Sequence, residues 1–298
     1  MRKVYPYTLL DVFTDQMFGG NQLAVFTQAE GLSDEQMQKI ANEMNLSETT
    51  FVTAGHDSDK PRVRIFTTSD EMPFAGHPTI GTAICLAHLN HQDGDEACSH
   101  WTLIEQVGPV PVTVDRSLPV AKAEFTTAVL PSLKRSALNK AQAARLLNIE
   151  QEKIFSAAMV GDCGAPFTLI ELTDKAAVDA VQIQASLKEL FYADSDWPAF
   201  YLFSRDDNHL YARMICQEVN LVEDAATGSA AAAVSGYLAQ SLESGHYHFY
   251  IEQGVQIGRP SQIELGITIG EGLCGQSGVT KVTVAGQAVI VGEGYLLL

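Results

Sequence analysis

The chain has few positively charged residues and no long hydrophobic run. Its 298 residues include 19 lysines and arginines against 36 aspartates and glutamates, which gives a formal net charge of −17. This charge repels nucleic-acid backbones and anionic membrane surfaces at long range, so we expect no nucleic-acid partner. No stretch approaches the ~20 apolar residues of a membrane span, so we also expect no membrane partner and a cytoplasmic location.

Motifs for several common chemistries are missing as well. The five cysteines are far apart, odd in number and without C-x-x-C spacing: Cys85, Cys98, Cys163, Cys216 and Cys274. We therefore expect neither a disulfide framework nor a metal site. The chain contains no G-x-x-x-x-G-K-[ST] motif, no G-x-G-x-x-G after a strand and no G-x-S-x-G. Nucleotide binding and serine hydrolysis thus have no support.

The composition, with 46% hydrophobic residues, is that of a globular protein with a substantial core. The length suggests two domains, or one large one, and we place a boundary near residues 120 to 130, giving domains 1–124 and 125–298. The residue patterns predict strands at Val4–Thr14, Leu23–Thr27, Thr50–Thr53, Val63–Thr67, Ala199–Ser204 and Leu210–Ile215, with further strands near the C-terminus. They predict helices at Leu32–Met44, Pro78–Leu89, Ala137–Leu147, Asp174–Leu190 and Thr227–Leu242.

Two segments of the chain share a layout. Glu71 precedes Gly76 by five positions, as Glu223 precedes Gly228, and a strand with an arginine lies before each glutamate. Each glycine is expected to open a helix whose free N–H groups and positive dipole end attract a carboxylate, despite the acidic surface. The alternative is that both are ordinary helix starts within two packed domains.

Five segments of this sequence resemble the phenazine-biosynthesis PhzF family, and they follow the expected order over nearly the whole chain. They are Phe18-Gly19-Gly20-Asn21 with Ala24-Val25-Phe26, Asn45 to Val52, Met72 to Pro78, Val222 to Ala231, and Gln253 to Ser261. The resemblance implies an α+β fold of diaminopimelate-epimerase type. Two pseudo-symmetric domains each wrap a curved, mostly antiparallel sheet around a central helix, with the site in the cleft between them. The last strand, about 285–298, could return to the first domain.

The resemblance also implies an activity. It implies a cofactor-free isomerase, commonly a homodimer, that moves a proton and a double bond on a small carboxylic acid. The expected partners are therefore a small anionic or zwitterionic carboxylic acid, similar to trans-2,3-dihydro-3-hydroxyanthranilate, and a second copy of the chain. No cofactor is expected. The chain departs from the family pattern at Phe66-Thr67-Thr68 and at Met214-Ile215-Cys216-Gln217, which leaves its natural substrate open.

Carried over residue by residue, the resemblance assigns Glu48 as the catalytic acid/base, with His77 and Asp224 as further catalytic residues. It assigns substrate binding to Asn21, Ser47, Gly76, Gly228 and Ser229. Each position also has a simpler interpretation. Glutamate at the start of a strand is ordinarily a solvated surface charge, and His77 or Asp224 could cap a helix. To abstract a carbon-bound proton, Glu48 must be ionised yet basic, which burial favours.

Two alternative functions remain open at this point. One is a small-molecule binding protein on the same scaffold, in which Glu48 only orients the ligand. The other is an epimerase that uses Glu48 with a second base, His77 or Asp224. Racemisation by two cysteines is not expected, because neither of the two helix starts carries a thiol.

Overall fold

The structure is a computed structural model that describes residues 3–56, 58–92, 96–195, 198–217, 221–271 and 277–298. Cys274 lies outside these residues. The chain divides into two compact units, Met1–Ala128 with Ala285–Leu298, and Val129–Val284. The long strand β17 (Ser277–Leu297) starts in the second unit and ends in the first. No described helix has the length and apolar character needed to cross a membrane.

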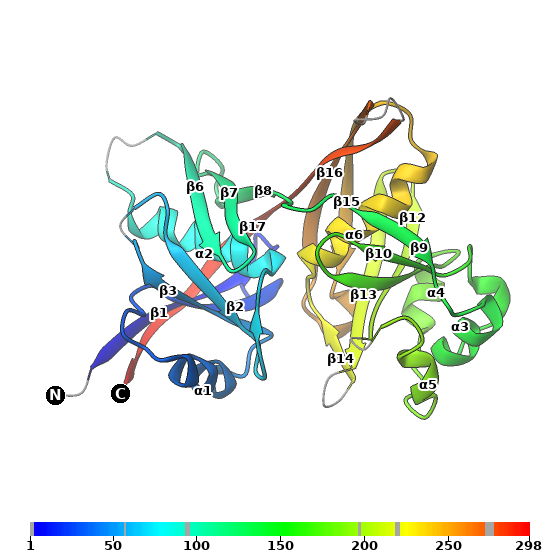
Figure 1. The fold of residues 1–298 in the computed structure, drawn as a ribbon, viewed down its shortest axis with the longest axis horizontal. Coiled ribbons are helices and arrows are strands. Elements are labelled where there is room, and N and C mark those ends of the chain that lie inside the picture. Colours follow the sequence, from blue (N-terminus) through cyan, green and yellow to red (C-terminus); the bar gives the residue numbers. More distant parts are fainter. Residues whose placement is uncertain (1–2, 57, 93–95, 196–197, 218–220, 272–276) are drawn as a thin grey trace. The chain divides into compact units, whose positions relative to one another are not determined.

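The first unit is a sheet packed around one helix. Strand β1 pairs antiparallel with β17 and with β2, β2 runs parallel to β3, and β3 pairs antiparallel with β4. Helix α2 packs against six strands of this unit, β1, β2, β3, β6, β7 and β8 (Figure 1). The elements are β1 (Val4–Val12), β2 (Asn21–Phe26), α1 (Asp34–Met44), β3 (Glu48–Ala54), β4 (Arg62–Phe66), β5 (Glu71–Met72), α2 (Gly76–Leu89), β6 (Cys98–Glu105), β7 (Gly108–Asp115) and β8 (Lys122–Thr126).

The second unit repeats this plan around helix α6, which packs against β9, β10, β11 and β16 (Figure 1). Its strands are β9 (Ser132–Arg135), β10 (Met159–Asp162), β11 (Pro166–Glu171), β12 (Ala199–Asp206), β13 (His209–Gln217), β14 (Leu221–Asp224), β15 (Gly245–Gln253) and β16 (Ser261–Glu271). Its helices are α3 (Lys140–Leu147), α4 (Lys175–Ala180), α5 (Lys188–Phe191) and α6 (Gly228–Leu238), with short 3₁₀ turns η1 (Gln151–Lys153), η2 (Ala239–Ser241) and η3 (Val255–Ile257).

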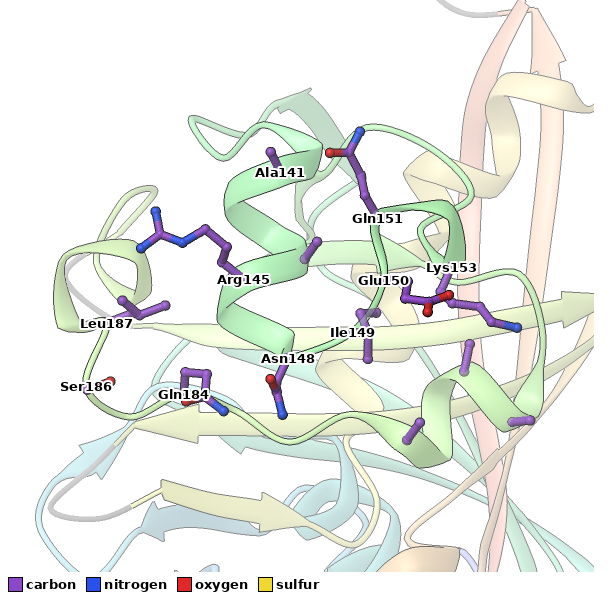
Figure 2. Close-up of a pocket in the computed structure, with 14 residues that line it drawn as sticks. Ala141, Arg145, Asn148, Ile149, Glu150, Gln151, Lys153, Gln184, Ser186 and Leu187 are labelled. Atoms are coloured by element: carbon purple, nitrogen blue, oxygen red, sulfur yellow. The ribbon is translucent and has the colours of Figure 1, made fainter.

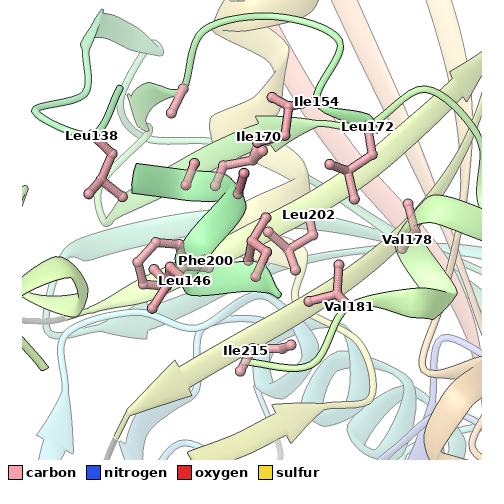
Figure 3. Packing of buried hydrophobic residues seen from close by; sticks show 14 of the residues in the cluster. Leu138, Leu146, Ile154, Ile170, Leu172, Val178, Val181, Phe200, Leu202 and Ile215 are labelled. Carbon is pink, nitrogen blue, oxygen red and sulfur yellow. The ribbon is translucent and has the colours of Figure 1, made fainter. Parts of the chain in front are cut away.

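Residue type explains the contrast between surface and central helices. In α1, Ser33 and Gln36 form the predicted capping box, and only one face is buried. In α2, every residue from Gly76 to Ala87 is buried, because small and apolar side chains cover the whole circumference. In the second unit, Phe200 and Leu202 of β12 face a separate apolar cluster with α3 and α4 (Figure 3). Helix α2 is therefore enclosed on all sides over this stretch.

The predicted helices differ from the structure in their bounds, and two of these differences have a clear physical cause. Helix α2 begins at Gly76, two residues before the predicted start at Pro78. Proline is tolerated there because the N–H groups of the first turn have no partner within the helix. The predicted helix Asp174–Leu190 is two short helices. Between them, the N–H groups of Gln182 and Gln184 donate to Leu147 and Leu146 at the end of α3, which replaces helical hydrogen bonds.

The two segments that share a sequence layout also share the same strand pairings in the structure. In the first unit Thr49 lies opposite Phe66, and Phe66 opposite Glu71. In the second, Phe200 lies opposite Ile215, and Ile215 opposite Glu223. The two glutamates thus occupy the same place, five residues before the glycine that opens the central helix. Residues of one unit can be matched to the other by this register.

Candidate active site

Glu48 is the first residue of β3, in parallel register with Leu23 of β2. Only 18% of its side chain is exposed, which is far less than a solvated surface charge would show. Its Oε2 atom is buried. The simpler interpretation of Glu48 as a surface charge is therefore wrong.

His77, the second residue of α2, faces Glu48. Its Nε2 atom lies 3.5 Å from Glu48 Oε2, and its Nδ1 atom lies 3.3 Å from Asn21 Nδ2. Burial lowers the pKa of His77 to about 3, although a backbone hydrogen bond with Gln22 opposes the shift. The imidazole is thus neutral at physiological pH, and its contact with Glu48 is a polar contact and not an ion pair. His77 does not cap α2, since the N-cap residue is Ala75.

Asn21 is buried at the start of β2, and the segment before it explains its position. The Phe18 N–H donates to Asp11 Oδ2 at 2.6 Å, which fixes the turn. Gly20 has a φ of +62°, and a Cβ there would lie 2.3 Å from Val12 O. Only glycine fits this position without strain. The motif ending at Asn21 therefore builds a tight turn that places the Asn21 amide against His77.

The other two candidates in this unit differ from each other. Gly76 is buried as the first residue of α2, and Ala75 before it provides no side-chain cap. The N-cap residue accordingly caps none of the first-turn N–H groups. Ser47, the residue before Glu48, is exposed. The structure therefore brings Asn21, Glu48, Gly76 and His77 together at the start of α2, with Ser47 beside Glu48 in the chain.

The second unit carries Asp224, Gly228 and Ser229 at the start of α6. Asp224 ends β14, and its Oδ2 accepts a hydrogen bond from Thr227 Oγ1 at 2.6 Å. The N-cap residue of α6 is Thr227, so Asp224 is not the helix cap. Gly228 and Ser229 are the first two residues of α6, and Gly228 is buried. The carboxylate of Asp224 thus holds the turn that leads into the helix.

Sequence reasoning assigned no role to Gln253, although it lies in a family segment. Gln253 is fully buried, and its Nε2 donates to Asp224 O at 2.9 Å and to Thr227 Oγ1 at 3.0 Å. The adjacent Gly254 has a φ of +77°, and a Cβ there would lie 2.6 Å from Ala225 O. This segment therefore fixes the turn between Asp224 and Thr227 from behind. The only signal in the sequence was the family motif itself.

Each unit braces the arm before its central helix with an arginine–glutamate pair. Arg64 Nε and Nη2 donate to the two carboxylate oxygens of Glu71 at 2.7 and 2.6 Å. Arg213 Nε and Nη2 donate to Glu223 in the same way, at 3.0 and 2.8 Å. Two parallel charge-assisted hydrogen bonds fix direction as well as distance. These arginines are thus committed to ion pairs and brace the arms.

A separate groove of about 1030 Å³ opens on the second unit between α3, η1 and α4 (Figure 2). Five of its fourteen lining residues are alanines, and Arg145 and Lys153 are its cations. It contains none of the candidate residues. Among the residues that the structure describes, no group of three histidine, cysteine, aspartate or glutamate side chains is placed to hold a metal ion.

Comparison with known proteins adds to this geometry. An uncharacterized isomerase of Mesorhizobium japonicum is 38% identical, over 98% of each chain. A trans-2,3-dihydro-3-hydroxyanthranilate isomerase of Pseudomonas chlororaphis is 33% identical, over 99% of this chain and 100% of that one. The crystal structure of a PhzF-family phenazine biosynthesis protein from Bacillus anthracis matches 99% of this chain and 100% of its own, with a TM-score of 0.83 and 20% identity.

The fold and the family expected from the sequence are both confirmed. The structural likeness shows the α+β, epimerase-like fold. Residues 10–294 match the family described as phenazine biosynthesis-like protein, PhzC-PhzF. The chain therefore belongs to the phenazine biosynthesis-like, PhzC-PhzF family of isomerases.

Proposed function

We propose that this isomerase moves a proton, and with it a double bond, on a small cyclic or unsaturated carboxylic acid. In this proposal Glu48 takes the proton from one carbon and returns it to another carbon on the same face of the substrate. The substrate class is that of trans-2,3-dihydro-3-hydroxyanthranilate, on which the 33% identical relative is named to act. The observation that carries the proposal is the partly buried Glu48 carboxylate facing the buried, neutral His77.

The neutral state of His77 matters for this chemistry. A charged imidazolium 3.5 Å from Glu48 would stabilise the carboxylate and make it a weaker base. A neutral ring lacks this full charge and stabilises the carboxylate less. Nδ1 lies on the side of Asn21, which leaves Nε2 facing Glu48. From there Nε2 can make a hydrogen bond with a polar group of the substrate while Glu48 transfers the carbon-bound proton.

Strand register supports a single base. Thr49 and Phe200 occupy matching positions, so Glu48 in the first unit corresponds to Ala199 in the second. Alanine can act as neither acid nor base, so the position that matches Glu48 provides no second base. We propose that Asp224, Gly228 and Ser229 hold the substrate, with the first-turn N–H groups of α6 attracting its carboxylate. Asn21, Ser47, Gly76 and His77 are the further substrate-binding residues of this proposal.

Reaction in D₂O tests this function against its two alternatives. The protein is incubated with trans-2,3-dihydro-3-hydroxyanthranilate and a panel of related unsaturated carboxylic acids, and the products are followed by NMR. The proposal expects a shifted double bond, with deuterium gained from solvent or hydrogen transferred within the molecule, and loss of both in Glu48→Gln. Binding without either change would indicate a binding protein. Inversion of one stereocentre without a shifted double bond would indicate an epimerase.

A further inference from the structure

A second buried acid lies at the start of α2. Glu105 is the last residue of β6 and only 5% of it is exposed. Its Oε1 lies 2.8 Å from Thr79 Oγ1, one turn into α2. Its Oε2 is buried and has no hydrogen-bond partner among the residues that the structure describes. An ionised carboxylate would be poorly solvated in this position.

Strand register identifies the counterpart of Glu105 in the second unit. Strand β6 runs parallel to β4 with Ile104 opposite Arg62, and β15 runs parallel to β13 with Glu252 opposite Tyr211. Arg62 and Tyr211 each lie two residues before the bracing arginine of their unit, so they occupy matching positions. The residues that follow, Glu105 and Gln253, therefore match as well.

Both side chains reach the same part of their unit. Gln253 binds the backbone and side chain of the turn that ends at Thr227, the N-cap of α6. Glu105 contacts Thr79, whose hydroxyl also lies 2.8 Å from the carbonyl of Ala75, the N-cap of α2. In each unit a buried side chain at the end of a strand thus fixes the start of the central helix.

A count of protons indicates the state of Glu105. The Thr79 hydroxyl has one proton but two oxygen neighbours at 2.8 Å, the Ala75 carbonyl and Glu105 Oε1. The carbonyl can only accept, so Thr79 donates to it. The remaining contact is a hydrogen bond only if Glu105 carries the proton and donates to Thr79. Burial raises the pKa of Glu105 to about 8, which agrees with a neutral acid.

We propose that Glu105 is a positioning residue that, as a neutral carboxylic acid, holds the first turn of α2 and with it Gly76 and His77. It plays the part that the Gln253 amide plays for α6, and its ionisation releases the contact with Thr79. The inference rests on the proposed function only in treating Gly76 and His77 as site residues. The hydrogen-bond arrangement does not depend on the substrate.

The groups around Glu105 do not supply a competing charge. Burial raises the pKa of Glu105 and outweighs the opposing effect of the Thr79 hydroxyl. On the neighbouring strands, Arg62 is exposed, and Arg64 and Glu71 are paired with each other. On α2, His77 is neutral by burial. The change of charge at alkaline pH is therefore assigned to Glu105 itself.

Amide NMR of the full chain tests the proposal without a substrate. The amide resonances of Gly76, His77 and Thr79 are followed against pH in wild type, in Glu105→Gln and in Glu124→Gln, which removes an exposed acid from β8. In wild type and in Glu124→Gln they should titrate together with a midpoint near 8. In Glu105→Gln they should stay at the wild-type low-pH positions throughout, since the amide can still donate to Thr79.

Two results would overturn the proposal: wild-type amides that do not titrate in this range, or the same titration in Glu105→Gln. The reciprocal variant Gln253→Glu provides a second measurement, and it should introduce an alkaline titration at Gly228 and Ser229. In an activity assay, the alkaline fall of kcat/KM near the same pH should vanish in Glu105→Gln. If no activity is found while the amides titrate as expected, the proposed function fails and the positioning role stands.

Discussion

His77 Nε2 lies 3.5 Å from Glu48 Oε2, yet burial keeps the pKa of His77 near 3 and the ring uncharged. In the unfolded chain the pKa is near 6.5, so between these values the unfolded state binds more protons. Stability should therefore fall as pH falls through this window, by up to ~1.4 kcal/mol per pH unit. Urea unfolding should show this slope in wild type relative to His77→Asn. His88→Asn, at an exposed position on the same helix, should keep it.

Glu105 should make the folding stability depend on pH with the opposite sign. Its pKa is about 8 in the folded state against 4.5 in the unfolded chain, so the folded state binds more protons between these values. Its contribution is complete below pH 4.5 and is lost as the pH rises to about 8. Wild type should thus lose stability relative to Glu105→Gln across this window, by up to ~1.4 kcal/mol per pH unit. Parallel urea-unfolding profiles for the two proteins would contradict this assignment.

Replacing Glu48 by glutamine should lower kcat by ~10²–10⁴-fold, the usual contribution of general acid–base catalysis, without unfolding the protein. The amide keeps the size and polarity of the side chain but cannot accept the proton. The assay is steady-state turnover of the unsaturated acid, with thermal unfolding as the check on folding. Glu43→Gln, an exposed position on α1, is the matched control and should turn over as wild type does. Wild-type turnover in Glu48→Gln would refute the mechanism.

Replacing the arginine by lysine should destabilise the protein to a different extent in the two arginine–glutamate pairs. Lysine keeps the charge but cannot make both parallel hydrogen bonds, so Arg213→Lys should cost ~1–3 kcal/mol of unfolding free energy. Arg64→Lys should cost less, because the Arg64 side chain is 24% exposed and that of Arg213 is 12% exposed. Arg213 also donates to two backbone carbonyls, those of Val178 and Val181. Exposed Arg62 is the control, and equal losses at all three positions would contradict the prediction.

Gly254→Ala should destabilise the second unit. The backbone there has a φ of +77°, and an added Cβ would lie 2.4 Å from Arg259 O. Strain of this kind costs ~1–3 kcal/mol, and the shifted backbone would move the turn beside Asp224. Gly292→Ala, where a Cβ meets nothing within 4 Å, is the control. Chemical unfolding measures both, and comparable stability of the two variants would show that the turn tolerates the methyl group.

Much of the architecture could be predicted from local sequence patterns. Ser33 and Gln36 form a capping box at the start of α1. It could be predicted from the sequence because the two residues lie within one helical turn of each other. The small residues of α2 and α6 allow a sheet to approach these helices closely, and the family resemblance implied such central helices. The split of the predicted helix Asp174–Leu190 could not be seen in this way. It depends on carbonyls of α3 that lie more than thirty residues earlier in the chain.

By itself, the sequence determined the family and the fold class, because continuous motifs with a recognisable spacing follow the family order along the chain. Only the tertiary structure decided that His77 is neutral and that Glu105 and Gln253 occupy matching positions. These properties depend on burial and strand register. Both arise when segments distant in the chain pack together, and neither leaves a pattern in the local sequence.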